Sequence, residues 1–171
     1  GTSWTNVTNG APIGSAAPDF VVVHPTNPSI AWVVLSGYST GNKVIKTING
    51  GASWTNISSN LPNIPANCAV YQPGSNDRIY VGMDIGVYYI DNSMANWVAY
   101  QYNLPNIPVS DMEISPADPS KLVATTYGRG TWKVDVIAAA APVTALSYTG
   151  TICAGTAKPF YDFSANAPTT W

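Results

Sequence analysis

The hexapeptide Asn60-Leu-Pro-Asn-Ile-Pro65 occurs a second time as Asn103-Leu-Pro-Asn-Ile-Pro108, 43 residues further along the chain. The same spacing separates three other pairs of residues: Trp54 and Trp97, Asn49 and Asn92, Pro73 and Pro116. Self-similarity at a fixed period is the signature of a repeat architecture. The 171-residue chain is therefore built from units of slightly more than forty residues.

A further marker, Trp4, precedes Trp54 by 50 residues instead of 43. The seven extra residues fall in two loops rich in Gly, Ser and Thr, at 10–17 and 37–42. Insertions of this kind are tolerated in loops. Trp4 is therefore expected to mark the end of one more repeat, cut by the start of the chain.

A period in the low forties fits either a four-stranded β-propeller blade or a helical solenoid repeat. Each unit consists of short runs of β-branched and aromatic residues separated by Gly, Pro or Asn, as 30–35 illustrates. Strong helix formers with helical spacing are missing. The sequence therefore predicts an all-β fold of four-stranded antiparallel propeller blades.

Strand counting predicts how the blades are divided along residues 1–137. Residues 1–7 are expected to be a lone fourth strand, 18–58 and 66–101 two complete blades, and 109–137 three strands of another. Because propellers usually have four to eight blades, these are interpreted as the C-terminal blades of an incomplete propeller. The remaining blades are expected upstream in the parent chain. They are therefore predicted to be a partner of these blades.

The turn Thr47-Ile-Asn-Gly-Gly-Ala-Ser-Trp54 resembles the Asp-box, or BNR repeat, of sialidase-like and sortilin-like propellers, with Asn49 where the family has Asp. The resemblance implies structural roles for Thr47, Asn49, Gly51, Ser53 and Trp54, away from any active site. Partial copies contribute three more structural residues: Trp4, Asn92 and Trp97. Replacing a buried Trp54 by Ala is expected to cost about 3–5 kcal/mol.

The stretch from Ser115 to Trp132 resembles the final propeller blade of large exported Bacteroidetes-type proteins, among them xyloglucanase-like and adhesin-like chains. Within it, 128–130 reads as a hairpin turn that exposes Arg129. A solvated turn is the ordinary interpretation. Tyr127 and Arg129 are the ligand contacts expected if the turn binds anything.

The run Ala138-Ala-Ala-Ala-Pro142 is a compositional break, and residues 138–144 are predicted to be a linker. Residues 145–171 resemble the beginning of a PKD-type Ig-like domain, on Phe160-Tyr-Asp-Phe-Ser164 and the residues around it. An Ig-like sandwich needs about 100 residues, so this β segment is truncated. Cys68 and Cys153 are expected to be buried thiols, with a disulfide between them as the alternative.

Catalytic residues are not predicted in the chain. A sialidase needs an arginine cluster, whereas only Arg78 and Arg129 are present. A glycosidase needs two facing carboxylates, and the candidates Asp84, Asp111 and Asp118 sit where Asp is ordinary in turns and at strand ends. The single histidine, His24, lacks a second ligand for a metal. No metal and no cofactor are predicted.

Aromatic residues offer one more candidate surface, because Tyr88, Tyr89, Tyr100 and Tyr102 could stack on a sugar. Charged residues make up only 9% of the chain and the net charge is −2, which disfavours nucleic-acid binding. No apolar run is long enough to cross a membrane.

The leading hypothesis is a non-catalytic scaffold or adhesive module of a large secreted or cell-surface protein, with a glycan or protein as ligand. The alternative is the C-terminal part of a propeller glycoside hydrolase, or another exported enzyme, with its catalytic residues upstream. A third possibility is a subunit whose edge strands, at Gly1 and Ala138, are completed by another chain.

Overall fold

The computed structural model describes residues 2–8, 10–138, 146–148 and 160–162. The chain divides into two compact units, Gly1–Ile137 and Ala138–Trp171. The boundary falls at the first residue of the segment predicted to be a linker.

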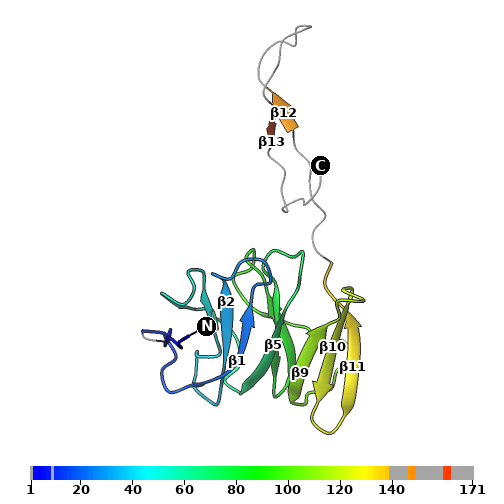
Figure 1. The fold of residues 1–171 in the computed structure, drawn as a ribbon. Helices are drawn as coiled ribbons and strands as arrows, with labels where there is room; N and C mark the ends of the chain where they lie inside the picture. The colour runs from blue at the N-terminus through cyan, green and yellow to red at the C-terminus, as the bar shows by residue number, and fades with distance from the viewer. Residues whose placement is uncertain (1, 9, 139–145, 149–159, 163–171) are drawn as a thin grey trace. The chain divides into compact units, whose positions relative to one another are not determined.

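The first unit contains two four-stranded sheets and one three-stranded sheet, each antiparallel and in chain order (Figure 1). The first blade consists of β1 (Ala17–Val23), β2 (Ala31–Ser36), β3 (Val44–Thr47) and β4 (Thr55–Asn56). The second blade consists of β5 (Ala66–Tyr71), β6 (Ile79–Met83), β7 (Gly86–Ile90) and β8 (Val98–Ala99). The third blade consists of β9 (Val109–Ile114), β10 (Lys121–Thr126) and β11 (Gly130–Asp135). The all-β prediction, with incomplete propeller blades, is confirmed.

The blades stand side by side through their first strands, since β5 lies against β1 on one side and β9 on the other. In the second blade the second strand is the most buried, since all five residues of β6 are buried. A strand covered by sheets on both faces has no polar face. This explains why Ile79-Tyr-Val-Gly-Met83 does not alternate between apolar and polar residues.

The same registers recur from blade to blade. Val44 is paired with Val34 in the first blade, and Val87, 43 residues later, is paired with Gly82 in the second. A backbone bond then ties the end of each third strand to the turn before the second strand. The three bonds are Gly50 N–H to Ser29 O, Asn92 N–H to Asn76 O, and Val136 N–H to Ser120 O. The sequence repeat is therefore a structural repeat.

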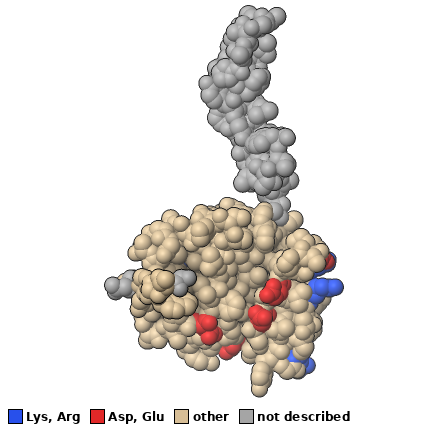
Figure 2. Space-filling view, in the orientation of Figure 1, with Lys and Arg blue, Asp and Glu red and all other residues tan. Residues whose placement is uncertain are grey.

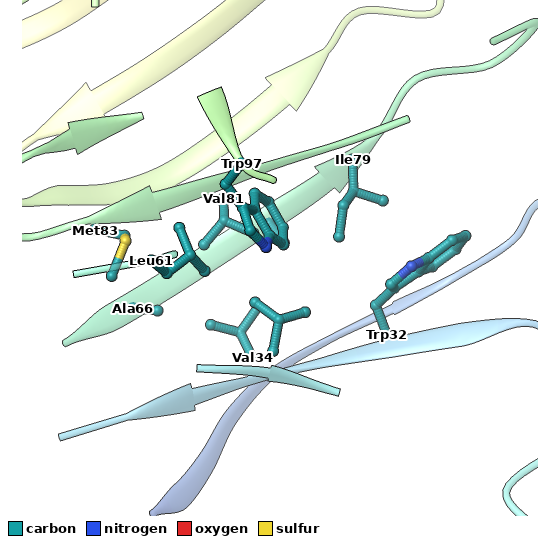
Figure 3. Close-up of a cluster of buried hydrophobic side chains, with 10 residues drawn as sticks. Trp32, Val34, Leu61, Ala66, Ile79, Val81, Met83 and Trp97 are labelled. Atoms are coloured by element: carbon teal, nitrogen blue, oxygen red, sulfur yellow. The ribbon is translucent and has the colours of Figure 1, made fainter. Parts of the chain in front are cut away.

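The apolar cores lie in the seams between blades. In the first seam, Trp32 and Val34 of the first blade pack with Ile79, Val81 and Trp97 of the second (Figure 3). The second seam is filled from the second and third blades by a cluster that includes Cys68, Tyr80, Val109, Met112 and Leu122. Because apolar burial is the main favourable term in folding, each blade is stabilised mainly by its neighbours.

The prediction of a fourth strand at residues 1–7 is wrong. Residues 2–8 form no strand, and the Trp4 side chain is fully exposed. A β-strand needs a neighbouring strand to bond its backbone groups. Among the described residues, no third strand is available beside this segment.

In the second unit, β12 (Leu146–Tyr148) and β13 (Phe160–Asp162) form an antiparallel pair. The rest of the predicted Ig-like segment, most of the predicted linker and Cys153 lie outside the described residues. Cys68 is free and buried. Across the described ranges, the structure contains no helix with the length and apolarity needed to cross a membrane.

Candidate functional site

Side-chain hydrogen bonds hold the 47–54 turn together. They stand in place of the backbone hydrogen bonds that a longer pair of strands would form. Thr47 Oγ1 accepts the backbone N–H of Gly51 at 3.0 Å and donates to Asn49 Oδ1 at 2.9 Å. Asn49 Oδ1 also accepts the backbone N–H of Ser53, and Asn49 Nδ2 donates to Ser53 Oγ at 2.8 Å. An amide supplies both an acceptor and a donor, so Asn49 bonds Ser53 through both its oxygen and its nitrogen.

Gly50 and Gly51 both have positive φ, at 67° and 87°, a region that costs other residues strain. They differ in their surroundings. A Cβ on Gly51 would lie 2.7 Å from Val7 Cβ, whereas a Cβ on Gly50 would meet nothing within 4 Å.

We therefore expect Gly51→Ala to lower the free energy of unfolding by about 2–4 kcal/mol, because strain and overpacking add. Gly50→Ala is the matched control, since it carries the strain alone, about 1–2 kcal/mol. Urea denaturation of both variants measures the difference. Equal losses would contradict the close contact between the turn and Val7, and Val7→Gly, which removes the Cβ that lies nearest, should relieve part of the Gly51→Ala loss.

The corresponding second turn keeps its tryptophan but changes its polar contacts. Asp91, one position before the Asn49 equivalent, now accepts the backbone N–H and hydroxyl of Ser93. Asn92 is released from the turn, and its amide donates to Asp77 Oδ2 at 2.9 Å. Met94 occupies the position of Gly51 without positive φ, because the turn closes through Asp91.

Trp54 and Trp97 make equivalent contacts with the preceding repeat. Trp54 Nε1 donates to Val7 O, and Trp97 Nε1 donates to Ile57 O, both at 2.7 Å. Each acceptor is the third residue after the preceding tryptophan. Trp97 is 3% exposed, whereas Trp54 is only half-buried, because less of the chain packs before the first blade. The tryptophans therefore fasten each repeat to the one before it.

A polar cluster closes one end of the first seam. Asp77 in the β5–β6 turn accepts Lys46 Nζ of the first blade at 3.2 Å, and His24 Nε2 lies 3.5 Å from its other oxygen. Tyr71 Oη lies 3.0 Å from His24 Nε2. The Lys46 ammonium also donates to Asn92 Oδ1 and lies 5.1 Å from the centre of the Trp32 ring.

The hydrogen bonds around His24 assign the proton of its neutral ring. His24 Nδ1 accepts the backbone N–H groups of Thr26 and Asn27, at 3.2 and 3.0 Å. Nε2 must then carry the proton and faces Tyr71 and Asp77. Every polar group of this cluster is satisfied by a neighbour from the other blade. The cluster therefore links the first blade to the second.

Arg78 and Asp91 form a buried ion pair inside the second blade, with Arg78 Nη2 at 2.7 Å from Asp91 Oδ2. Arg78 Nη1 also donates to Ile137 O at 3.0 Å, and Gln72 Nε2 donates to the same carbonyl at 2.7 Å. Tyr80 Oη accepts the Ile137 N–H at 2.9 Å. The backbone of Ile137, which follows the third blade, is therefore hydrogen-bonded to side chains of the second blade.

Sequence reasoning missed both polar clusters. The Arg78–Asp91 pair could have been predicted from the sequence. Ile79 and Ile90 lie opposite each other in the hairpin, so Arg78 and Asp91, which flank them, must also be neighbours. The His24 cluster had none, because its members come from two blades and their packing decides which side chains meet.

The tyrosines named as a sugar platform divide between two locations. Tyr88 packs into the first seam, whereas Tyr89, Tyr100 and Tyr102 lie on the other side with Tyr80. Tyr100 and Tyr102 meet edge to face with ring centres 5.2 Å apart. Burial, assisted by nearby Tyr80, raises the pKa of Tyr100 to about 12. Its hydroxyl therefore stays protonated and donates to Asp135 O.

A small pocket opens beside these rings, with a cavity volume of about 30 Å³. Its walls are Tyr100, Tyr102 and Leu104 from the end of the second blade, and Leu122, Ala124 and Trp132 from the third, with Val87, Lys133 and Val134 completing it. The lining is largely apolar and aromatic, as in sites that bind small molecules or side chains. We take this pocket as a candidate binding site.

The remaining predicted contacts lie apart from this pocket. Tyr127 is 79% exposed, and Arg129 is exposed in the turn between β10 and β11. Asp118 is occupied in its own turn, where it accepts the N–H and hydroxyl of Ser120. Asp84 accepts Asn67 Nδ2 at 3.0 Å, and Asp111 accepts the N–H of Met112.

Acidic side chains are nevertheless grouped on the face that carries β1, β5 and β9 (Figure 2). Burial raises the pKa of the Cys68 thiol on β5 to about 12, and the carboxylates of Asp111 on β9 and Asp19 on β1 add to the rise. Carboxylates from two blades therefore flank the middle strand. No group of three or more His, Cys, Asp or Glu side chains within the described ranges is arranged to hold a metal.

No protein-family model matches the chain, and no curated protein matches its sequence. Among solved structures, the GH74 xyloglucanase from Xanthomonas campestris resembles it with a TM-score of 0.51 at 15% sequence identity. The match covers 67% of this chain and 20% of the xyloglucanase, so the chain spans about a fifth of that protein's length. At this identity the likeness concerns the fold alone. The described blades are those of an incomplete β-propeller.

Proposed function

We propose that the chain is a non-catalytic propeller module of a large secreted or cell-surface protein, where it presents binding surfaces. The proposal rests on the contacts that the buried charged side chains make. His24, Lys46 and Asp77 meet across the first seam, and Arg78 with Asp91 holds the exit of the third blade. These charged side chains bond one another and hold the blades together, so they do not face a substrate.

The geometry of the 47–54 turn supports an assignment to the Asp-box repeats. Thr47, Asn49, Gly51 and Ser53 are joined by hydrogen bonds within the turn, which accounts for the spacing of the motif. In this proposal the motif is structural. The PKD-like segment would add a second β domain beyond the propeller.

Binding in place of turnover is the expected result when the chain is incubated with a panel of glycans and peptides. Retention on a glycan array, with no release of reducing ends, would support the module. Tyr127→Ala and Arg129→Ala should weaken retention at least tenfold if the exposed turn is the contact, whereas Tyr38→Ala, a similarly exposed tyrosine, should not. Turnover by the chain would overturn the proposal.

A second candidate is a part of a propeller glycoside hydrolase. The similarity to a GH74 xyloglucanase and the carboxylates of Asp19 and Asp111 beside Cys68 favour it. Its test is hydrolysis of xyloglucan by the chain and by its parent protein. Asp111→Asn should abolish hydrolysis if these carboxylates act, whereas Asp118→Asn, in a turn, should leave it unchanged. An unaffected Asp111→Asn variant would exclude this role.

A further inference from the structure

The backbone at the end of β11 is bonded to two blades within three residues. Val136 N–H donates to Ser120 O of the third blade at 2.8 Å, and Tyr100 of the second blade donates its hydroxyl to Asp135 O. Ile137 then has both of its backbone groups bonded to side chains of the second blade. We call residues 135–137 the exit strap, because the chain continues from them into the second unit, Ala138–Trp171.

Three buried side chains form a cradle around the backbone groups of Ile137. Arg78 Nη1 and Gln72 Nε2 donate to its carbonyl, at 3.0 and 2.7 Å. Tyr80 Oη accepts its N–H at 2.9 Å and donates to Gln72 Oε1 at 2.8 Å. Burial raises the pKa of Tyr80, so the hydroxyl keeps the proton that this last bond needs. Because all three side chains are at most 9% exposed, little water competes for these bonds.

The cradle is a departure from the repeat. In the third blade, the residues 43 positions after Gln72, Arg78 and Tyr80 are Ser115, Lys121 and Val123. These three cannot make the same bonds, because the serine has no amide and the valine has no hydroxyl. A buried polar side chain costs stability unless it is hydrogen-bonded. The polar residues of the second blade therefore indicate a role that is specific to the exit strap.

A pull on the chain beyond residue 137 reaches the exit strap before it reaches the rest of β11. β10 and β11 are paired along their whole length, with Asp135 in the last pair. A pull on that end would open the pairs one after another, so each pair would bear the load alone. The cradle provides another route, because Tyr80 lies on β6, which is bonded to β5 on one side and β7 on the other. Arg78, just before β6, is held by two bonds to Asp91.

We propose that Gln72, Arg78 and Tyr80 form a load-bearing clamp on Ile137. The clamp passes tension on the chain beyond Ile137 to the middle of the second blade and keeps that tension from β11. It holds backbone groups, so the grip does not depend on the side chain at position 137. This role concerns the mechanical route through the fold and is independent of any ligand or activity of the chain.

The first measurement is single-molecule pulling on the full 171-residue chain. One handle is at the C-terminus and the other at Asn76→Cys, an exposed position in the turn before β6. Cys153→Ser is included, and Cys68 is buried, so the introduced thiol is the one that reacts. In Tyr80→Phe we expect the force at which the first unit begins to unfold to fall at least twofold. Tyr89→Phe, whose ring lies 6.0 Å from that of Tyr80, removes a hydroxyl outside the clamp and should keep the wild-type force.

The direction of the pull separates a clamp from a general loss of stability. When the C-terminal handle is moved to Arg129→Cys, in the turn between β10 and β11, the exit strap is no longer in the loaded path. Chains with Tyr80 and with Tyr80→Phe should then begin to unfold at the same force. The proposal is overturned if Tyr80→Phe loses no force when pulled from the C-terminus, or loses as much when pulled from Arg129→Cys.

The second measurement is hydrogen exchange at single amides, followed by NMR. Exchange at the Ile137 amide reports opening of the clamp, because a bonded amide exchanges when its bond opens. We expect Tyr80→Phe to speed this exchange at least tenfold. The Val136 amide, which is bonded to Ser120 O, should exchange at its wild-type rate. Unchanged exchange at Ile137, or an equal increase at Val136, would show that the hydroxyl does not hold the strap.

Discussion

Trp97→Ala is expected to lower the free energy of unfolding by about 3–5 kcal/mol, the range for removing a large buried aromatic ring. Trp97 is 3% exposed and packs with residues of both blades at the first seam. Its removal would leave a cavity between two sheets, and the Ile57 carbonyl would lose its indole donor. Urea denaturation followed by circular dichroism measures the change.

Two comparisons separate the parts of this effect. Trp97→Phe keeps most of the apolar contact and removes the hydrogen bond, so a loss of about 1–2 kcal/mol is expected. Trp54→Ala, at the equivalent but half-buried position, should cost about 1–2 kcal/mol, below the range that the sequence alone indicated. A Trp97→Ala loss no greater than that of Trp54→Ala would contradict the seam packing.

Breaking the Arg78–Asp91 pair should have an effect of similar size. Removing one partner of a buried ion pair leaves the other without compensation, at a cost of about 3–5 kcal/mol. Asp91→Ala would strand Arg78, whose side chain is 11% exposed. Replacing both residues by leucine should recover much of the loss, because well-packed apolar residues often substitute for such pairs.

A matched surface pair provides the control. Lys121 and Asp135 are joined across β10 and β11, with the Asp135 side chain 74% exposed. Because water screens such pairs, Lys121→Ala should leave the free energy of unfolding unchanged. If Asp91→Ala also left the free energy of unfolding unchanged, the Arg78–Asp91 pair would not stabilise the fold.

The same pair gives a pH dependence with a definite sign. Burial alone would raise the pKa of Asp91, but hydrogen bonds from Ser93 and the contact with Arg78 outweigh it and lower the pKa below 3.8. A lowered folded-state pKa contributes stability that is complete above the unfolded value and lost as pH falls through the folded value. Asp91→Asn should therefore flatten the fall in stability below about pH 4. An unchanged acid limb would contradict the lowered pKa.

Much of the fold could be predicted from the repeat because each blade depends on local features. The spacing of Trp54 and Trp97 gave the period, and the polar residues between 47 and 54 marked a tight turn. Strand pairing within a blade joins segments that are close in sequence, and turn residues fix its register. The four-stranded sheets follow from these local rules.

The candidate site is different. The pocket near Tyr100 could be recognised only once the second and third blades were placed together, since its walls come from both. Tyr88 was grouped with Tyr100 by its residue type, yet the two rings face different seams. Residue type predicts an aromatic surface, but strand direction decides which face it joins.

The sequence by itself determined the blade: its period, its four short strands, its turns and the tryptophan at its end, because all of these are encoded within about forty residues. Only the tertiary structure decided what joins one blade to the next. His24 meets Asp77, Arg78 meets the Ile137 carbonyl, and Trp97 meets the Ile57 carbonyl across 40 residues or more. Such contacts depend on how two sheets pack, and no local pattern specifies that geometry.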